Sequence, residues 1–207
     1  MKSAFLVAMI LIGVSSADFV DVGQDSIGMN RPFCGDCWQS LRFQMLALDS
    51  EIGTAMTIGS ISFKRAPLGS DDGYVNLGTF QIYMGLCQSD QLSVTFENNY
   101  LPGSRILVYD HDSVTITAGA PDEWFEIQFD TPYFYAGHDN LVIELTWDAG
   151  SESIFTWGYN AGPARLISGG YGHTTGDAET AISHIRLNGT LDLERATFGG
   201  IKVLTGR

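Results

Sequence analysis

Two cysteines separated by two residues form the clearest chemical pattern in the chain. Cys34 and Cys37 bracket Gly35 and Asp36, and Cys87 is the third cysteine. Such a pair can form a disulfide, act as a redox centre that opens a helix, or supply two of the four ligands of a structural zinc ion. A strand-like run follows the pair here, so we predict a structural disulfide, either Cys34–Cys37 or one of the two with Cys87. The odd count leaves one thiol free or paired with another chain.

Acidic side chains recur in turns, where carboxylates and backbone carbonyls together suit a hard cation. Asp110 and Asp112 flank His111, and Asp139 precedes Asn140. No contiguous calcium-loop signature is present, so we predict a composite calcium site with Asp110, Asp112 and Asp139 as candidate ligands. The alternative is that these residues only close their turns by bonding their own backbone.

Catalytic motifs are absent from the sequence. There is no Gly-x-Ser-x-Gly, and none of the four histidines lies in a recognised base motif. His184 alternates with apolar neighbours and is expected to face solvent. Glu126 and Glu144 fall on the polar faces of two strand-like runs, and glycoside hydrolysis needs two acids about 5–9.5 Å apart. Solvent-facing acids are common on an acidic protein, so we predict no enzyme and keep a glycosidase or esterase as the alternative.

Aromatic side chains near strand ends suggest a binding role. Trp124 is out of phase with the apolar face of its own strand-like run, and Tyr133, Tyr135, Tyr159 and Tyr171 lie in or beside expected loops. Flat rings offer apolar faces to the C–H groups of sugars. We therefore take Trp124, Tyr133, Tyr135 and Tyr159 as candidate ligand-binding residues, against the alternative that they clamp the core.

Alternating apolar and polar residues predict the strands that must position these side chains. Leu141–Trp147 places four apolar residues on one face and Glu144 and Thr146 on the other, which is typical of a half-buried strand. Frequent turn signals predict an all-β fold, an antiparallel β-sandwich of jelly-roll type with ten or eleven strands. The expected strands are Leu41–Leu48, Ser60–Lys64, Thr79–Met84, Leu92–Glu97, Arg105–Tyr109, Val114–Ala118, Trp124–Phe129, Leu141–Trp147, Ile154–Tyr159, Ala164–Ile167 and Ile182–Leu187.

The two ends of the chain predict export of a single domain. Residues 1–17 combine Lys2, an apolar run and small residues at the end, which is typical of a signal peptide. We expect residues 18–40 to form an extended arm with the cysteine pair, 41–190 the sandwich, and 191–207 a C-terminal extension or last strand. Unpaired ends of this kind can exchange strands between copies.

The net charge limits the partners. A formal charge of −13 repels nucleic acid and anionic lipid, so we expect neither, and no later segment is long and apolar enough for membrane insertion.

Several segments, in order, resemble a known family. The chain looks like the β-sandwich domains of secreted bacterial surface proteins, which are similar to adhesin and carbohydrate-binding jelly rolls. The resemblance covers residues 32–187. It rests on Pro32–Gly35, Arg42–Leu46, Ser50–Gly53, Gly59–Phe63, Phe80–Gly85, Phe96–Tyr100, Trp124 with Phe129–Pro132, and Tyr135–Glu144.

The resemblance and the loop aromatics together imply a secreted or cell-surface module that acts in adhesion or carbohydrate binding. Its partner would be an extracellular glycan or a surface protein. The alternative, suggested by the two ends and the odd cysteine, is a structural subunit that binds copies of itself in an extracellular filament or coat.

Overall fold

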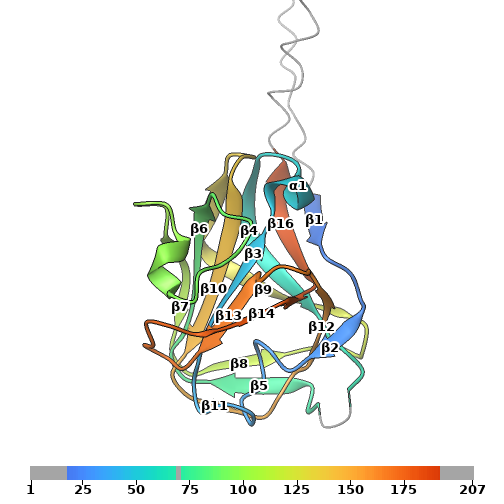
Figure 1. The fold of residues 1–207 in the computed structure, drawn as a ribbon. Helices are drawn as coiled ribbons and strands as arrows, with labels where there is room; N and C mark the ends of the chain where they lie inside the picture. Colours follow the sequence, from blue (N-terminus) through green and yellow to red (C-terminus); the bar gives the residue numbers. More distant parts are fainter. Residues whose placement is uncertain (1–17, 69–70, 192–207) are drawn as a thin grey trace, which may run out of the picture.

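The structure, a computed structural model, describes residues 18–68 and 71–191. It confirms an all-β antiparallel sandwich, with sixteen strands among the described residues (Figure 1). The predicted signal peptide and nearly all of the predicted C-terminal extension lie outside the described residues. The strands are β1 (Asp18–Val22), β2 (Ile27–Met29), β3 (Leu41–Ala47), β4 (Met56–Lys64), β5 (Tyr74–Leu77), β6 (Phe80–Cys87), β7 (Ile106–His111), β8 (Val114–Thr117), β9 (Trp124–Tyr135), β10 (Asn140–Trp147), β11 (Gly150–Ser151), β12 (Thr156–Asn160), β13 (Leu166–Gly169), β14 (Asp177–Glu179), β15 (Ala181–Ser183) and β16 (Ile185–Leu191).

Two large sheets enclose the core. One has the strand order β14-β13-β3-β10-β6-β7 and the other β1-β16-β4-β9. Two three-stranded sheets, β11-β5-β8 and β15-β12-β2, extend the sandwich, and Figure 1 shows β5, β8 and β11 together at its lower end. The inner faces bury large apolar side chains, including Phe43, Phe63, Leu145 and Trp147. Their removal from water is the main stabilising contribution to the fold. None of the helices in the described part is long and apolar enough to cross a membrane.

Residues 18–40 are part of the sandwich, so the expectation of an extended arm outside it is wrong. β1 pairs with β16 along its whole length, and β2 pairs with β12. Phe33 is fully buried in the core and contacts the rings of Phe63 and Phe125. The domain therefore includes residues 18–40, and the boundary predicted at residue 41 has no structural counterpart.

β10 is buried on both faces, although its sequence alternates like a half-buried strand. It lies between β3 and β6, and all eight of its residues are buried. The second face is covered because residues 88–105 cross over it instead of forming the strand predicted at Leu92–Glu97. Leu92 and Phe96 pack there on Val142, and the segment includes the short 3-10 helix η1 (Phe96–Asn99), seen outside β6 and β10 in Figure 1.

Candidate functional site

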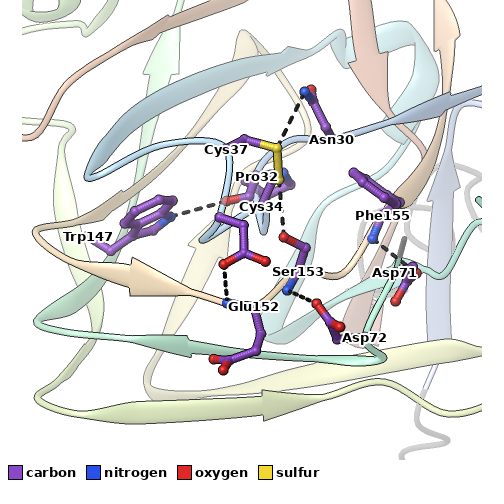
Figure 2. The surroundings of a disulfide bond; sticks show 11 residues. Asn30, Pro32, Cys34, Cys37, Asp71, Asp72, Trp147, Glu152, Ser153 and Phe155 are labelled. Atoms are coloured by element: carbon purple, nitrogen blue, oxygen red, sulfur yellow. Dashed lines mark hydrogen bonds between the residues drawn. A yellow bond between two sulfur atoms is a disulfide. The ribbon is translucent and has the colours of Figure 1, made fainter. Parts of the chain in front are cut away.

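The predicted Cys34–Cys37 disulfide is formed, and it closes a turn that is anchored on all sides (Figure 2). Trp147 donates a hydrogen bond from Nε1 to the Pro32 carbonyl at 3.1 Å, and Ile154 N donates to the Phe33 carbonyl at 2.9 Å. Gly35 is required at this turn because a Cβ there would lie 2.4 Å from the nitrogen of Ser151. The turn is thereby a rigid platform for the residues that follow it.

Cys87, the third cysteine, is unpaired and buried. Burial raises the pKa of its thiol, so the reactive thiolate is suppressed. We expect no chemistry from it.

Trp38 projects next to this platform with 36% of its surface exposed. The guanidinium of Arg31 lies over the indole ring, 4.8 Å from its centroid. Both terminal nitrogens of Arg31 bind the Glu179 carboxylate on β14, at 3.1 and 3.0 Å. The ring is held in one place by a stacked cation that is itself fixed by the carboxylate of Glu179.

The loop between β13 and β14 forms the other wall. The His173 nitrogen donates to the Gly170 carbonyl at 3.0 Å, which closes a tight turn that contains Tyr171. The Tyr171 nitrogen donates to Ser40 Oγ at 3.1 Å, and the His173 carbonyl accepts from Arg42 Nη1 at 3.0 Å. These hydrogen bonds to Ser40 and Arg42 keep the loop in place.

A cleft of about 650 Å³ lies between these two walls. Volumes of about 300–1,000 Å³ are usual for ligand sites. Its residues combine one large aromatic ring with hydroxyl, amide, imidazole and carboxylate groups, so it can stack on a flat apolar surface and bond to surrounding hydroxyls. The lining consists of Arg31, Cys37, Trp38, Gln39, Ser40, Leu41, Ser168, Gly169, Gly170, His173, Thr175, Gly176 and Asp177.

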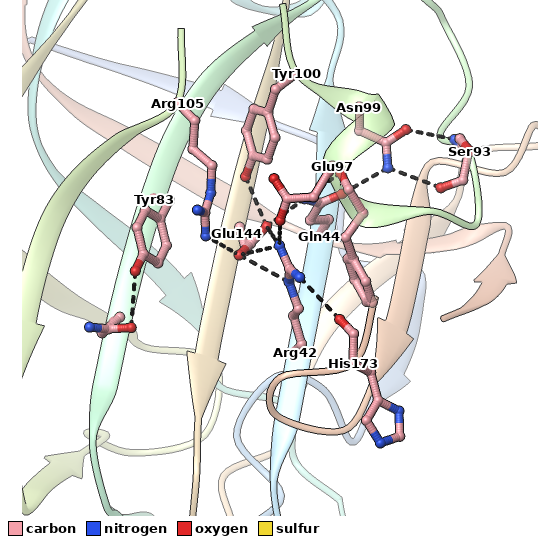
Figure 3. A network of polar contacts seen from close by, with 12 residues as sticks. Arg42, Gln44, Tyr83, Ser93, Glu97, Asn99, Tyr100, Arg105, Glu144 and His173 are labelled. Atoms are coloured by element: carbon pink, nitrogen blue, oxygen red, sulfur yellow. Dashed lines mark hydrogen bonds and ion pairs between the residues drawn. The ribbon is translucent and has the colours of Figure 1, made fainter. Parts of the chain in front are cut away.

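A buried charged network stands beside the cleft on the outer face of the six-stranded sheet (Figure 3). Glu144, with no exposed surface, accepts from Arg42 Nε at 3.2 Å and Arg105 Nη2 at 2.7 Å through Oε1. Its Oε2 accepts from Arg42 Nη2 at 3.2 Å, Gln44 at 2.5 Å and Tyr100 at 3.0 Å. Donors from four side chains therefore surround this carboxylate.

The network also shifts the pKa values of two side chains in it, Glu97 and Tyr100. A 2.6 Å hydrogen bond from Arg42 holds the pKa of Glu97 below its ordinary value, so this carboxylate stays ionised. Burial first, and then the charge of Glu144, raises the pKa of Tyr100 well above its ordinary value. Tyr100 therefore remains a neutral donor to Glu144.

The four predicted ligand-binding aromatics are not brought together. The strand expected to end at Phe129 continues as β9 through Tyr135, so Tyr133 and Tyr135 lie in a strand with buried rings and not in a loop. Tyr159 is half-buried and donates to Glu51 Oε1 at 2.8 Å. Trp124 is half-buried on the outer face of the other sheet, with Arg186 over its ring at 4.4 Å. They do not form a common binding surface.

The three predicted calcium ligands cannot share one ion. Asp110 pairs with Gln81, which itself pairs with β10 near the end of that strand. Asp139 directly precedes the first residue of β10. About 20 Å of strand therefore separates Asp110 from Asp139. Asp110 accepts from Gln81 and Asp112 from Thr79, both at 2.9 Å. Across residues 18–68 and 71–191, no three His, Cys, Asp or Glu side chains gather as metal ligands would.

Two side chains that were expected to face solvent, Glu144 and His184, are buried. Glu126 is exposed on the four-stranded sheet, and Glu144 is buried on the outer side of the six-stranded sheet, so the sandwich separates them and they cannot act as a catalytic pair. His184 does not face solvent freely. It is 9% exposed, bonds through Nδ1 to Asp25 at 2.6 Å, and contacts the Trp124 ring. The backbone between β15 and β16 is irregular, so the alternation that predicted an exposed His184 does not hold there.

Trp38, Tyr83 and Arg105 were not selected from the sequence as site residues. Trp38 follows the cysteine pair outside any alternating run, and a large aromatic residue directly after such an anchored turn was the available signal. Tyr83 and Arg105 carry no signal, because they meet only through strand pairing and the return of residues 88–105 over the sheet. Neither a protein-family model nor a curated protein matches the chain.

Proposed function

We propose that the protein is a secreted, non-catalytic β-sandwich module that binds extracellular carbohydrate, in adhesion or in retention at a surface, through the cleft beside Trp38. The observation that carries this proposal is the exposed, immobilised indole in a cleft of about 650 Å³ whose other walls are mainly polar. Sugars need this combination, since their ring faces are apolar and their edges carry hydroxyls.

Preorganisation of both walls supports the proposal. The disulfide turn fixes one wall, and bonds to Ser40 and Arg42 fix the other, so little conformational entropy would be lost on binding. The predicted signal peptide and the disulfide both favour an extracellular location, where such a ligand would be found.

The test is binding of a glycan microarray by the protein that begins at Asp18, compared with its Trp38→Ala variant. We expect selective binding that the variant weakens by about tenfold or more, because it loses both the apolar area buried by the ring and a stacking contribution of roughly 0.5–1.5 kcal/mol, where about 1.4 kcal/mol is tenfold in affinity. Phe134→Ala is the matched control, since that ring is 60% exposed on β9 of the other sheet. Equal binding by all three proteins would refute a site at Trp38.

A further inference from the structure

A smaller hollow of about 260 Å³ opens on the outer face of the six-stranded sheet, next to the cleft. This volume is below the range of about 300–1,000 Å³ that complete ligand sites occupy. The hollow is therefore suited to part of a ligand. It is lined by Arg42, Gln81, Tyr83, Glu97, Arg105, Glu144, Thr146, Tyr171 and Gly172.

One rigid turn divides the hollow from the cleft. Gly170 and His173 line the cleft, whereas Tyr171 and Gly172 between them line the hollow. Arg42 in the hollow also holds the His173 carbonyl, as Figure 3 shows. A ligand that enters the cleft and extends beyond it over this turn would reach the hollow, and the Tyr171 ring, 43% exposed, stands on its path.

The hollow presents one exposed cation and one exposed anion. The Arg105 side chain is 31% exposed and lies over the Tyr83 ring, 3.7 Å from its centroid. The Glu97 side chain is 59% exposed. Their buried partners, Arg42 at 10% and Glu144 at 1%, hold both in position. The two guanidinium and two carboxylate charges cancel.

This arrangement fits adjacent sugar hydroxyls. One hydroxyl can donate to the Glu97 carboxylate while its neighbour accepts from the Arg105 guanidinium. An acidic sugar would meet the ionised Glu97 and the field of a chain with net charge −13. The chemistry of the hollow thus favours a neutral sugar over a uronic acid.

We propose that the hollow is a second subsite of the carbohydrate site, and that the ligand is a neutral oligosaccharide long enough to lie across the Tyr171 turn. This inference rests on the proposed function, and it adds the length and the charge class of the ligand. Trp38 holds one end of the chain, and Glu97 with Arg105 hold hydroxyls further along it.

Isothermal titration with neutral gluco-, xylo- and manno-oligosaccharides, from disaccharide to hexasaccharide, tests the inference, with oligogalacturonates as the acidic probes. We expect the affinity for the best neutral series to rise about tenfold with chain length. Tyr171→Ala removes this rise and leaves disaccharide binding unchanged. Glu97→Gln keeps the side-chain shape and reduces the discrimination against oligogalacturonates. Glu126→Gln, an exposed acid on the other sheet, changes neither, and thermal melting verifies that each variant is folded.

Two other results would overturn the inference alone. The first is binding that depends on Trp38 but has the same affinity for all chain lengths and is not changed by Tyr171→Ala. The second is a preference for oligogalacturonates over the neutral oligosaccharides. Failure of every oligosaccharide to bind would refute the proposed function together with the inference.

Discussion

Replacing Glu144 by glutamine should destabilise the domain severely, although the change removes only one charge. The carboxylate accepts five hydrogen bonds from four side chains and has no exposed surface. A glutamine has one acceptor oxygen, so the donors that face its amide nitrogen lose their partner, and Arg105 loses its only salt bridge among the described residues. Removing one partner of a buried ion pair costs about 3–5 kcal/mol.

Urea denaturation measures this loss. Domains of this class unfold with a slope of about 2 kcal/mol per molar urea, so the midpoint of Glu144→Gln should fall by about 1.5–2.5 M. Glu126→Gln is the control, because Glu126 is exposed and surface changes usually stay within about 0.5 kcal/mol. Equal midpoints for the two variants would refute the role assigned to the buried network.

Three further changes test the fold. Burial raises the pKa of Tyr133 from 10.0 to about 12, so the stability that its neutral form contributes below pH 10 is lost between pH 10 and 12. The melting temperature of Tyr133→Phe should therefore depend less on pH in this range than that of the wild type. The same dependence on pH in both proteins would contradict this. Gly189→Ala should cost about 1–3 kcal/mol in urea denaturation, since its Cβ would lie 1.9 Å from the Thr57 carbonyl oxygen, whereas Gly59→Ala should have little effect. Alanine at both Cys34 and Cys37 should lower the free energy of unfolding by about 2 kcal/mol, which is the entropic contribution of closing so short a loop. A melting temperature of the wild-type protein that strong reductant leaves unchanged would argue against this.

The strand pattern of the sequence predicted the inner faces of the sandwich well. Apolar alternation along Leu141–Trp147 identified β10 and the side chains that it turns to the core. The same pattern failed for the outer face, because a period of two does not reveal what covers the polar side. There, Glu144 is buried by Tyr100 and by residues from β3, which are about 40 and 100 positions away in the chain.

The candidate site was less predictable for a similar reason. The spacing of Cys34 and Cys37 sufficed for the disulfide, which is a local feature. The cleft instead depends on the approach of two loops, and Ser40 bonds to Tyr171 across 131 residues of sequence. Local pattern carries no information on such a contact. It also favoured Tyr133 and Tyr135, whose rings turned out to be core residues because β9 extends beyond its expected end.

The most direct test of carbohydrate binding at the cleft is microarray binding by the wild-type domain, Trp38→Ala and Phe134→Ala, measured side by side. We predict selective retention of neutral glycans by the wild type and Phe134→Ala, with loss in Trp38→Ala. Retention of no glycan by the folded wild-type domain, or equal retention by all three proteins, would contradict it.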